Sequence, residues 1–142
     1  MEYQWVLSPT AVDWVALSDL HRMAGLSEKR PADLEVSFTN SRYACFVYDD
    51  DALIGAGRAL ADGVDCSYIC DLAVHPDYQR TGVGTGILSH LVEMSRGHRK
   101  IILYAAPGRE DFYRKLGFRR MKTAMALFQD QDGAVSRGLL DE

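Results

Sequence analysis

The segment Gln79–Thr85 carries the residues whose types and spacing best suit a chemical site. It is Gln-Arg-Thr-Gly-Val-Gly-Thr, and apolar residues at helical spacing, Val83, Ile87 and Leu91, begin within it. A glycine-bearing turn at the start of a helix presents unpaired backbone N–H groups at the positive end of the helix dipole. Glycine also lets a bound group approach the backbone closely. The segment therefore predicts an anion site, and phosphate is the usual ligand of such a site.

The two common nucleotide-binding fingerprints do not fit this segment. A dinucleotide site needs a third glycine where the sequence has Ile87, and Gly86 comes one position early. A P-loop needs Gly-Lys-Ser/Thr, whereas Leu88 and Ser89 follow here. On this segment alone, a nucleotide ligand and a purely structural glycine turn both stay open as alternatives.

Two further segments lie in register with the glycine turn. The first, Leu72-Ala73-Val74-His75-Pro76, ends a strand-like run just before the turn. The second, Phe112-Tyr113-Arg114-Lys115-Leu116-Gly117-Phe118, follows downstream. In type, order and spacing, these segments and the glycine turn resemble the GNAT superfamily of N-acetyltransferases. The resemblance covers residues 67–128, and the three motifs in register are far more specific than any one of them.

The resemblance implies acetyl-CoA as co-substrate, with its diphosphate on the N–H groups of the turn and its pantetheine along the preceding strand. The Val74 N–H would then polarise the thioester carbonyl, an oxyanion-type contact. In the family this strand usually carries a β-bulge, which splays it from its neighbour and opens a cleft. The implied cofactor-binding residues are Leu72, Ala73, Val74, Gln79, Arg80, Thr81, Gly82, Val83, Gly84, Thr85 and Tyr113.

Tyr113 and Asp71 are the expected catalytic residues. Tyr113 matches the family's tyrosine that protonates the departing CoA thiolate, and a phenol with a pKa of about 10 can donate to a thiolate. Asp71 is the candidate base for the incoming amine, directly or through a water, because a carboxylate in an apolar strand is costly unless paired or used. By alternation, Asp71 should share a face with Ile69 and Ala73. A structural ion pair stays open as the alternative role of Asp71.

The expected function is transfer of an acetyl group to a primary amine by direct attack in a ternary complex. Whether a small molecule or a protein carries that amine is left open, and the resemblance also allows a homodimer. One position departs from the family: many relatives have an asparagine that contacts the pantetheine where this chain has Ala106. The alternative function is therefore a catalytically silent CoA-binding sensor or interaction module.

Composition sets limits on partners and location. The net charge of −4 argues against a nucleic-acid partner, since phosphate chains need a basic face. The three cysteines, Cys45, Cys66 and Cys70, and the scattered histidines show no metal-ligand spacing, so no metal is expected. We expect no membrane span, because no apolar run reaches about eighteen residues. The first residues lack a secretory signal, which favours the cytoplasm.

The helices and strands that must position these residues are typical of an α/β (α+β) fold, which we expect to form a single domain, residues 1–142. We expect a mixed, mostly antiparallel sheet with a splayed central strand pair, flanked by about four helices. Helices are expected from Ser8-Pro9 to Gly25, from Pro31, over 82–97 and over 108–116, with Ser8 as the first N-cap. Strands are expected over 3–7, 43–48, 52–60, 67–74, 100–105 and 123–128, and the tail from Gln129 is expected to be loosely held.

Overall fold

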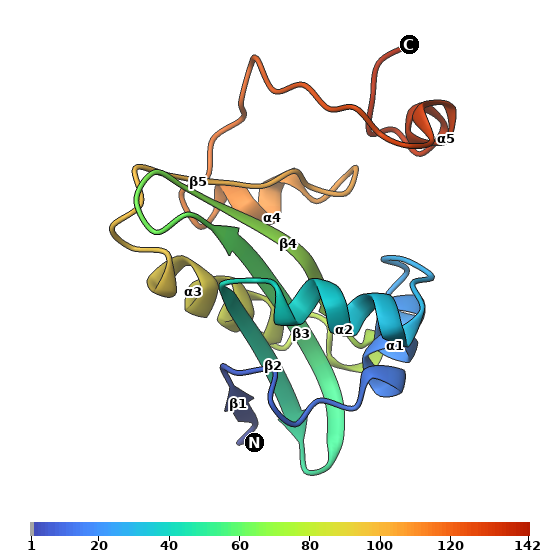
Figure 1. Ribbon diagram of the computed structural model, residues 1–142, viewed down its shortest axis with the longest axis vertical. Helices are drawn as coiled ribbons and strands as arrows, with labels where there is room; N and C mark the ends of the chain where they lie inside the picture. Colours follow the sequence, from blue (N-terminus) through green and yellow to red (C-terminus); the bar gives the residue numbers. More distant parts are fainter. Residues whose placement is uncertain (1) are drawn as a thin grey trace. The chain divides into compact units, whose positions relative to one another are not determined.

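The computed structural model describes residues 2–142, which form two compact units, residues 2–103 and 104–142. The first unit holds a five-stranded sheet in the order β1-β2-β3-β4-β5 (Figure 1). Its strands are β1 (Gln4–Val6), β2 (Tyr43–Asp49), β3 (Ala52–Ala61), β4 (Cys66–Val74) and β5 (Lys100–Ile102). The first three pairings are antiparallel and the pairing of β4 with β5 is parallel. This confirms the predicted mixed, mostly antiparallel sheet.

Helices cover both faces of this sheet (Figure 1). On one face, α1 (Trp14–Met23) and α2 (Pro31–Thr39) close a buried apolar cluster. On the other, α3 (Val83–Met94) packs so closely that a Cβ at Gly57 would lie 2.9 Å from the Ile87 side chain. Full burial of a Leu or Phe side chain contributes about 1.5–3 kcal/mol, so these two layers hold the sheet in place. The cluster under α1 and α2 consists of Leu17, Leu20, Leu34, Phe38, Ala44, Phe46, Ala56 and Ala73.

The pairing of β4 with β5 is short. Only Cys66, Ser67 and Tyr68 have partners in β5, where Lys100 begins the pairing. From Ile69 onward, no strand of residues 2–103 pairs with that edge of β4. Within residues 2–103, the second half of β4 therefore has an edge without a partner strand, as the predicted splayed strand pair requires.

The first helix begins later than predicted. It starts at Trp14, and the Asp13 carboxylate accepts hydrogen bonds from the Val15 and Ala16 N–H groups at 3.0 and 3.1 Å. Ser8 is therefore not its N-cap, because the Asp13 carboxylate satisfies two of the helix's first N–H groups. At the other end the prediction is close, since Gly25 follows the C-cap with a φ of 72°.

The second unit, residues 104–142, holds two short helices, α4 (Glu110–Arg114) and α5 (Gln131–Ser136). The predicted strand over 123–128 is wrong, because the segment forms no strand and its Met125 and Leu127 are 94% and 90% exposed. An apolar run forms a strand only where a neighbouring strand supplies hydrogen bonds. In the tail, Asp130 caps α5 by accepting a hydrogen bond from the Gly133 N–H at 2.9 Å.

Candidate active site

The turn before α3 has the conformation that the sequence predicts for an anion site. Arg80 and Gly82 adopt left-handed φ values of 65° and 89°. Gly82 is the N-cap of α3 and has no side chain to satisfy the first N–H groups of the helix. The first backbone hydrogen bond of α3 runs from the Gly86 N–H to the Gly82 carbonyl at 2.9 Å. The N–H groups of Val83, Gly84 and Thr85 precede it and point out from the helix end, where they can hold an anion.

Hydrogen bonds anchor this turn to the sheet. A 3₁₀ turn, Pro76–Tyr78, leads into it, and the Tyr78 hydroxyl donates to the Asp49 carboxylate at 2.5 Å. The Gln79 side chain donates to the Val74 carbonyl at 3.3 Å, and the Thr81 hydroxyl donates to the Tyr78 carbonyl. Since these bonds tie the turn to β2 and to the end of β4, its N–H groups are held in a fixed position relative to both strands.

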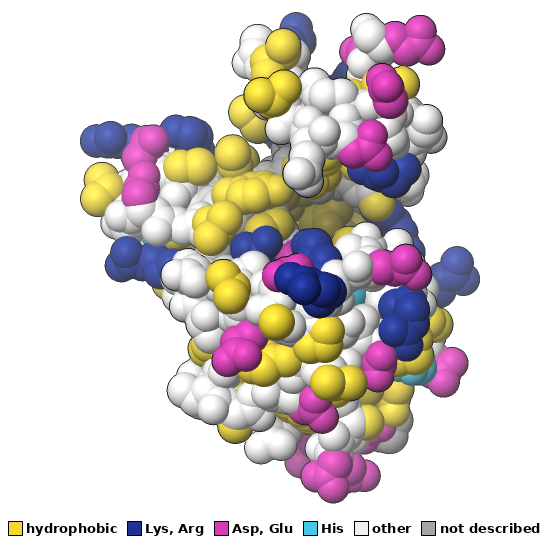
Figure 2. Space-filling view, turned by 45° about the vertical axis from the view of Figure 1, so that its right-hand side comes forward, with side chains coloured by type: hydrophobic (Ala, Val, Ile, Leu, Met, Phe, Trp, Pro, Cys, Tyr) yellow, Lys and Arg dark blue, Asp and Glu magenta, His cyan; other side chains and the backbone are white. Residues whose placement is uncertain are grey.

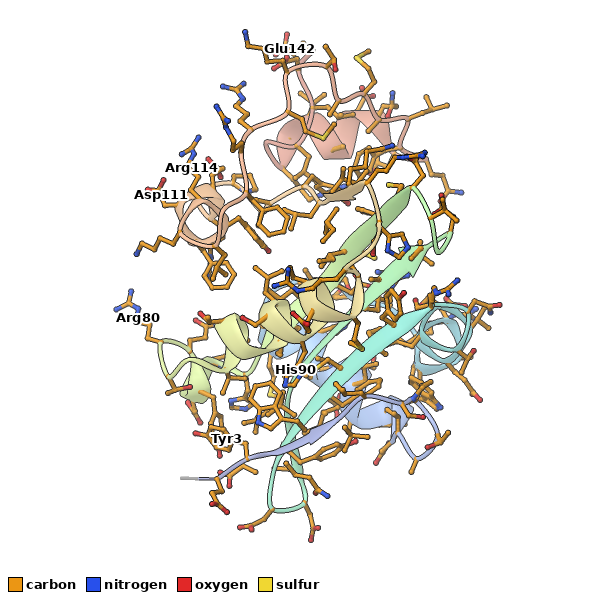
Figure 3. The ribbon with its side chains drawn as sticks, turned by 90° about the vertical axis from the view of Figure 1, so that its left-hand side faces the viewer. Tyr3, Arg80, His90, Asp111, Arg114 and Glu142 are labelled. Atoms are coloured by element: carbon orange, nitrogen blue, oxygen red, sulfur yellow. The ribbon has the colours of Figure 1, made fainter. Side chains whose placement is uncertain are left out.

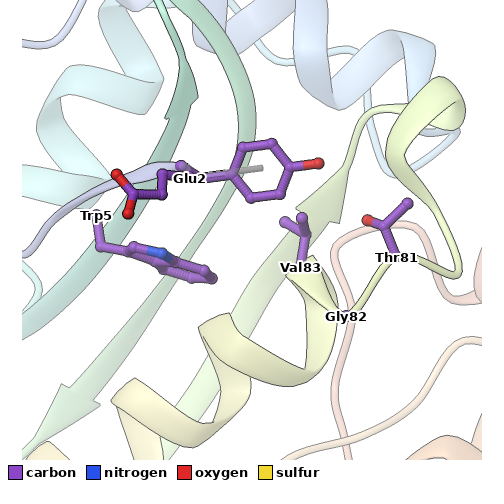
Figure 4. Close-up of a pocket in the computed structure, with 6 residues that line it drawn as sticks. Glu2, Trp5, Thr81, Gly82 and Val83 are labelled. Carbon is purple, nitrogen blue, oxygen red and sulfur yellow. The ribbon is translucent and has the colours of Figure 1, made fainter.

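An open pocket of about 440 Å³ adjoins the turn (Figure 4). Thr81, Gly82 and Val83 form one side of it, and residues from the start of the chain, including Trp5, form the other. The Trp5 ring packs on α3, where a Cβ at Gly86 would clash with it and the His90 ring centroid lies 5.1 Å from that of Trp5. Figure 3 shows His90 on the side of α3 that faces β1, and Arg80 with its side chain extending away from the turn.

A β-bulge lies directly before the strand end that should bind pantetheine. Arg58 of β3 pairs with Cys70 but Ala56 pairs with Ala73, so β4 has one extra residue opposite Gly57. Asp71 sits in this bulge with a φ of 56°, a left-handed value that is uncommon outside glycine. The family resemblance anticipates such a bulge, and the sequence by itself cannot locate it.

The bulge changes which residues share a face. Asp71 points to the α1–α2 face, as Ala73 does, which agrees with the prediction for those two residues. Ile69 was expected on the same face but lies opposite Ala59, on the α3 side of the sheet. Strand alternation fails here because the two bulge residues interrupt the period of two.

Asp71 makes two ion pairs. Its carboxylate accepts a hydrogen bond from the Arg58 Nε at 2.8 Å, and the Lys29 Nζ lies 3.1 and 3.3 Å from its two oxygens. Burial opposes ionisation of Asp71 most strongly. However, the hydrogen bonds and charges of Arg58 and Lys29 together outweigh it, so the pKa of Asp71 lies below its usual value. The carboxylate is therefore an anion and a weak base, and its catalytic role stays a prediction.

His21 of α1 is a buried group near Asp71 that the sequence reasoning did not single out. Its Nδ1 lies 3.1 Å from the Ser27 hydroxyl, while its Nε2 has no hydrogen-bond partner in residues 2–142. Burial, partly opposed by the charge of Asp71, lowers the pKa of His21 to about 4. It is therefore neutral at physiological pH. No spacing motif marks His21, although its helical position four residues after Leu17 could have indicated burial.

Tyr113 lies in the second unit, on α4. Its ring packs edge-on against Phe112 and Phe118, with ring centroids 5.0 and 6.1 Å away. Burial raises the pKa of Tyr113, and the nearby Arg109 partly offsets this effect. The phenol is thus protonated at neutral pH and able to donate, while its role as the acid stays a prediction.

Charge and metal-ligand chemistry set further limits. On the face in Figure 2, acidic side chains gather at the end where the β2–β3 hairpin turns through Asp49, Asp50 and Asp51. Elsewhere in that view, Lys and Arg side chains are interspersed with Asp and Glu side chains. Within residues 2–142, no three metal-ligating side chains form a group and no helix is both long and apolar enough to cross a bilayer. Burial raises the pKa of the Cys45 and Cys70 thiols to about 12 and about 11, respectively.

Comparison with known proteins identifies the family. The family model described as "Acetyltransferase (GNAT) domain" matches residues 41–120, more than half of the chain. The protein is a member of the GNAT acetyltransferase family. Family members normally use acetyl-CoA as donor and amines as acceptors. The matched range includes the bulge in β4, the glycine turn and Tyr113.

Individual relatives agree with this assignment. An uncharacterised N-acetyltransferase, ycf52-like, of Prochlorococcus marinus is 29% identical over 82% of this chain and 69% of its own length. Serotonin N-acetyltransferase 2, chloroplastic, of Oryza sativa is 32% identical over 78% of this chain, which spans only 58% of that protein. A solved structure from meticillin-resistant Staphylococcus aureus has a TM-score of 0.77 and 26% identity, covering 89% of this chain and 99% of that one.

Proposed function

We propose that this GNAT protein transfers the acetyl group of acetyl-CoA to a primary amine by direct attack in a ternary complex. The observation that carries the proposal is the junction of β4 and α3. There a strand edge without a partner in residues 2–103 runs into a helix N-terminus whose N-cap, Gly82, has no side chain. The first feature suits the amide groups of pantetheine and the second suits a diphosphate.

The donor would lie along this junction. Its diphosphate would accept hydrogen bonds from the N–H groups that begin α3, with Gln79, Arg80 and Thr81 alongside. Pantetheine would follow Leu72–Val74, and the Val74 N–H would stabilise the oxyanion that forms as the amine attacks. The bulge supports this arrangement, because an extra residue changes the direction of the strand just before Leu72.

Two proton transfers complete the proposed reaction. The acceptor enters as an ammonium and must lose a proton before its nitrogen has a lone pair. The lowered pKa of Asp71 favours a water held by its carboxylate over direct abstraction as the route of that proton. The departing thiolate would take a proton from Tyr113, whose raised pKa keeps the phenol protonated.

A second candidate function is a CoA-binding sensor or interaction module without catalysis. Two observations favour it: Asp71 is already paired with Arg58 and Lys29, and Ala106 replaces the family's asparagine. Both functions share the donor site and differ only in turnover. Under the first function the acceptor is an amine of a small molecule or of a protein, and a homodimer is compatible with either function.

Calorimetry and thiol release together test the proposal. We expect CoA and acetyl-CoA to bind, and acetyl-CoA with one amine of a broad panel to release free thiol. Gly84→Asp should abolish CoA binding, because it brings a carboxylate to the anion site. Binding without thiol release for any amine would favour the sensor, whereas tight binding of ATP or NAD in place of CoA would overturn both candidates.

The cytoplasm remains the expected location, although the rice relative is named as chloroplastic. Cell fractionation of the native host, followed by immunodetection of the protein, tests this expectation. Recovery of the protein in an organelle fraction would contradict it.

A further inference from the structure

The proposed function assigns no role to Lys29, which is one of the two cations on Asp71. Lys29 lies between α1 and α2, and its backbone carbonyl accepts a hydrogen bond from the Ser18 hydroxyl at 2.7 Å. Its side chain reaches across to β4, where the Nζ lies 3.1 and 3.3 Å from the Asp71 oxygens. The primary ammonium of Lys29 is therefore paired with the carboxylate that is expected to bind the ammonium of the acceptor.

The two cations on Asp71 differ in exposure. The Arg58 side chain is 13% exposed and its guanidinium also lies over the Phe38 ring, 5.7 Å from the centroid. The Lys29 side chain is 40% exposed and borders an open pocket of about 210 Å³, which is lined by Ser18, Arg22, Glu28, Lys29 and Arg30. Arg58 is thus a fixed partner of Asp71, while Lys29 has open space into which it can move.

We propose that Lys29 is a self-acetylation site: its amine occupies the acceptor's position against Asp71 and takes the acetyl group when no acceptor is bound. The inference rests on the proposed function. Asp71 directly precedes Leu72–Val74, the segment that pantetheine would follow to place its thioester at the Val74 N–H. A lysine side chain has four methylenes and moves about flexible bonds, so its nitrogen can leave Asp71 and swing along the strand toward the thioester carbon.

The reaction balances without a further co-reactant. The Lys29 ammonium loses a proton, and the Nζ lone pair attacks the thioester carbon to form an N–C bond. The C–S bond breaks and CoA leaves as a thiolate. The nitrogen then loses a second proton, so that of the two protons released, one ends on the CoA thiol and the other in the solvent. The product is a neutral acetyl-lysine, which leaves Asp71 paired with Arg58 alone.

Lys100 provides a matched control within the same chain. It is also paired with an aspartate, Asp65, at 2.7 Å and is 52% exposed, so it is at least as accessible as Lys29. It lies opposite Cys66 at the far end of β4. Five strand residues at about 3.3 Å each separate that end from Asp71 by roughly 16 Å. Slow chemical acetylation by free acetyl-CoA should affect both lysines, whereas transfer within the site should affect only Lys29.

The test is incubation of the full chain with acetyl-CoA and no amine, followed by peptide mass spectrometry of every lysine. We expect Lys29 to be acetylated at least about ten-fold faster than Lys100, because proximity favours the intramolecular reaction. Its rate should not depend on protein concentration, and it should fall when excess CoA competes for the donor site. Lys29→Arg should keep the charge and lose the modification.

The contrary outcomes separate this inference from the function on which it rests. Equal labelling of Lys29 and Lys100, or labelling that excess CoA does not slow, would overturn self-acetylation. So would an unmodified Lys29 in a protein that binds CoA and acetylates an added amine, and the proposed function would then stand. A protein that binds no CoA would overturn the function itself, and the inference with it.

Discussion

Gly82→Ala is the substitution that most directly probes the start of α3. Gly82 has a φ of 89°, and a Cβ built on it would have no heavy atom within 4 Å. The alanine methyl therefore meets no steric obstacle from the protein. The cost of the substitution comes from the left-handed backbone and from a methyl group at the surface that the diphosphate must approach.

The expected magnitudes follow from these two effects. Holding a residue other than glycine in a left-handed conformation costs about 1–2 kcal/mol, so we expect a loss of that size in the free energy of unfolding. Gly97→Ala is the matched control. Gly97 follows the other end of α3, has a φ of 98° and also has open space around its Cβ. Both variants should lose similar stability, whereas only Gly82→Ala should bind CoA more weakly, by about 5–30-fold for a further 1–2 kcal/mol.

Urea unfolding measures the first quantity and calorimetric titration with CoA measures the second. Both should be done at one temperature and salt concentration, because charge–charge attraction is screened by salt. The reasoning would be refuted if Gly82→Ala and Gly97→Ala bound CoA with affinities that agree within experimental error. Loss of affinity in both variants alike would also refute it, since the effect would then reflect general destabilisation of α3.

Three further predictions concern other parts of the molecule. Tyr113→Phe should lower turnover by about 10²–10⁴-fold and leave CoA affinity nearly unchanged, and wild-type turnover would show that another group is the acid. Urea unfolding at a series of pH values should show stability lost as pH falls from about 6.5 to about 4, since folded His21 titrates near 4 and unfolded His21 near 6.5. The loss should approach about 3 kcal/mol and vanish in His21→Gln, whereas a flat profile for the wild type would contradict the buried neutral imidazole. Gly86→Ala should lower the free energy of unfolding by about 1–3 kcal/mol through overpacking against Trp5, and an unchanged melting temperature would argue against that contact.

The junction of β4 and α3 was predictable because its signals are local. The apolar run before His75, the glycines of the turn and the helical spacing after them fix the strand, turn and helix within a few residues. The N-cap of α1 could not be predicted in the same way, because Ser8 and Asp13 are both residue types that commonly cap the N-terminus of a helix. Only the folded chain shows that the Asp13 carboxylate accepts hydrogen bonds from two N–H groups.

The surroundings of Asp71 could not be predicted because they depend on long-range pairing. Lys29 comes from a loop 42 residues away in sequence, and Arg58 from the neighbouring strand. The bulge that turns Asp71 toward them is set by the register between β3 and β4, which strand alternation cannot reveal. The expected strand over 123–128 failed for a related reason, since its apolar run says nothing about whether a partner strand is present.

The most direct test of the central claim is a two-dimensional amide NMR titration of the protein with CoA. If the start of α3 holds the diphosphate, the N–H signals of Val83, Gly84 and Thr85 should shift strongly and saturate, as should that of Val74. Signals at Gly97, at the other end of the helix, should stay in place. Unmoved signals at the turn in the presence of saturating CoA would contradict the account.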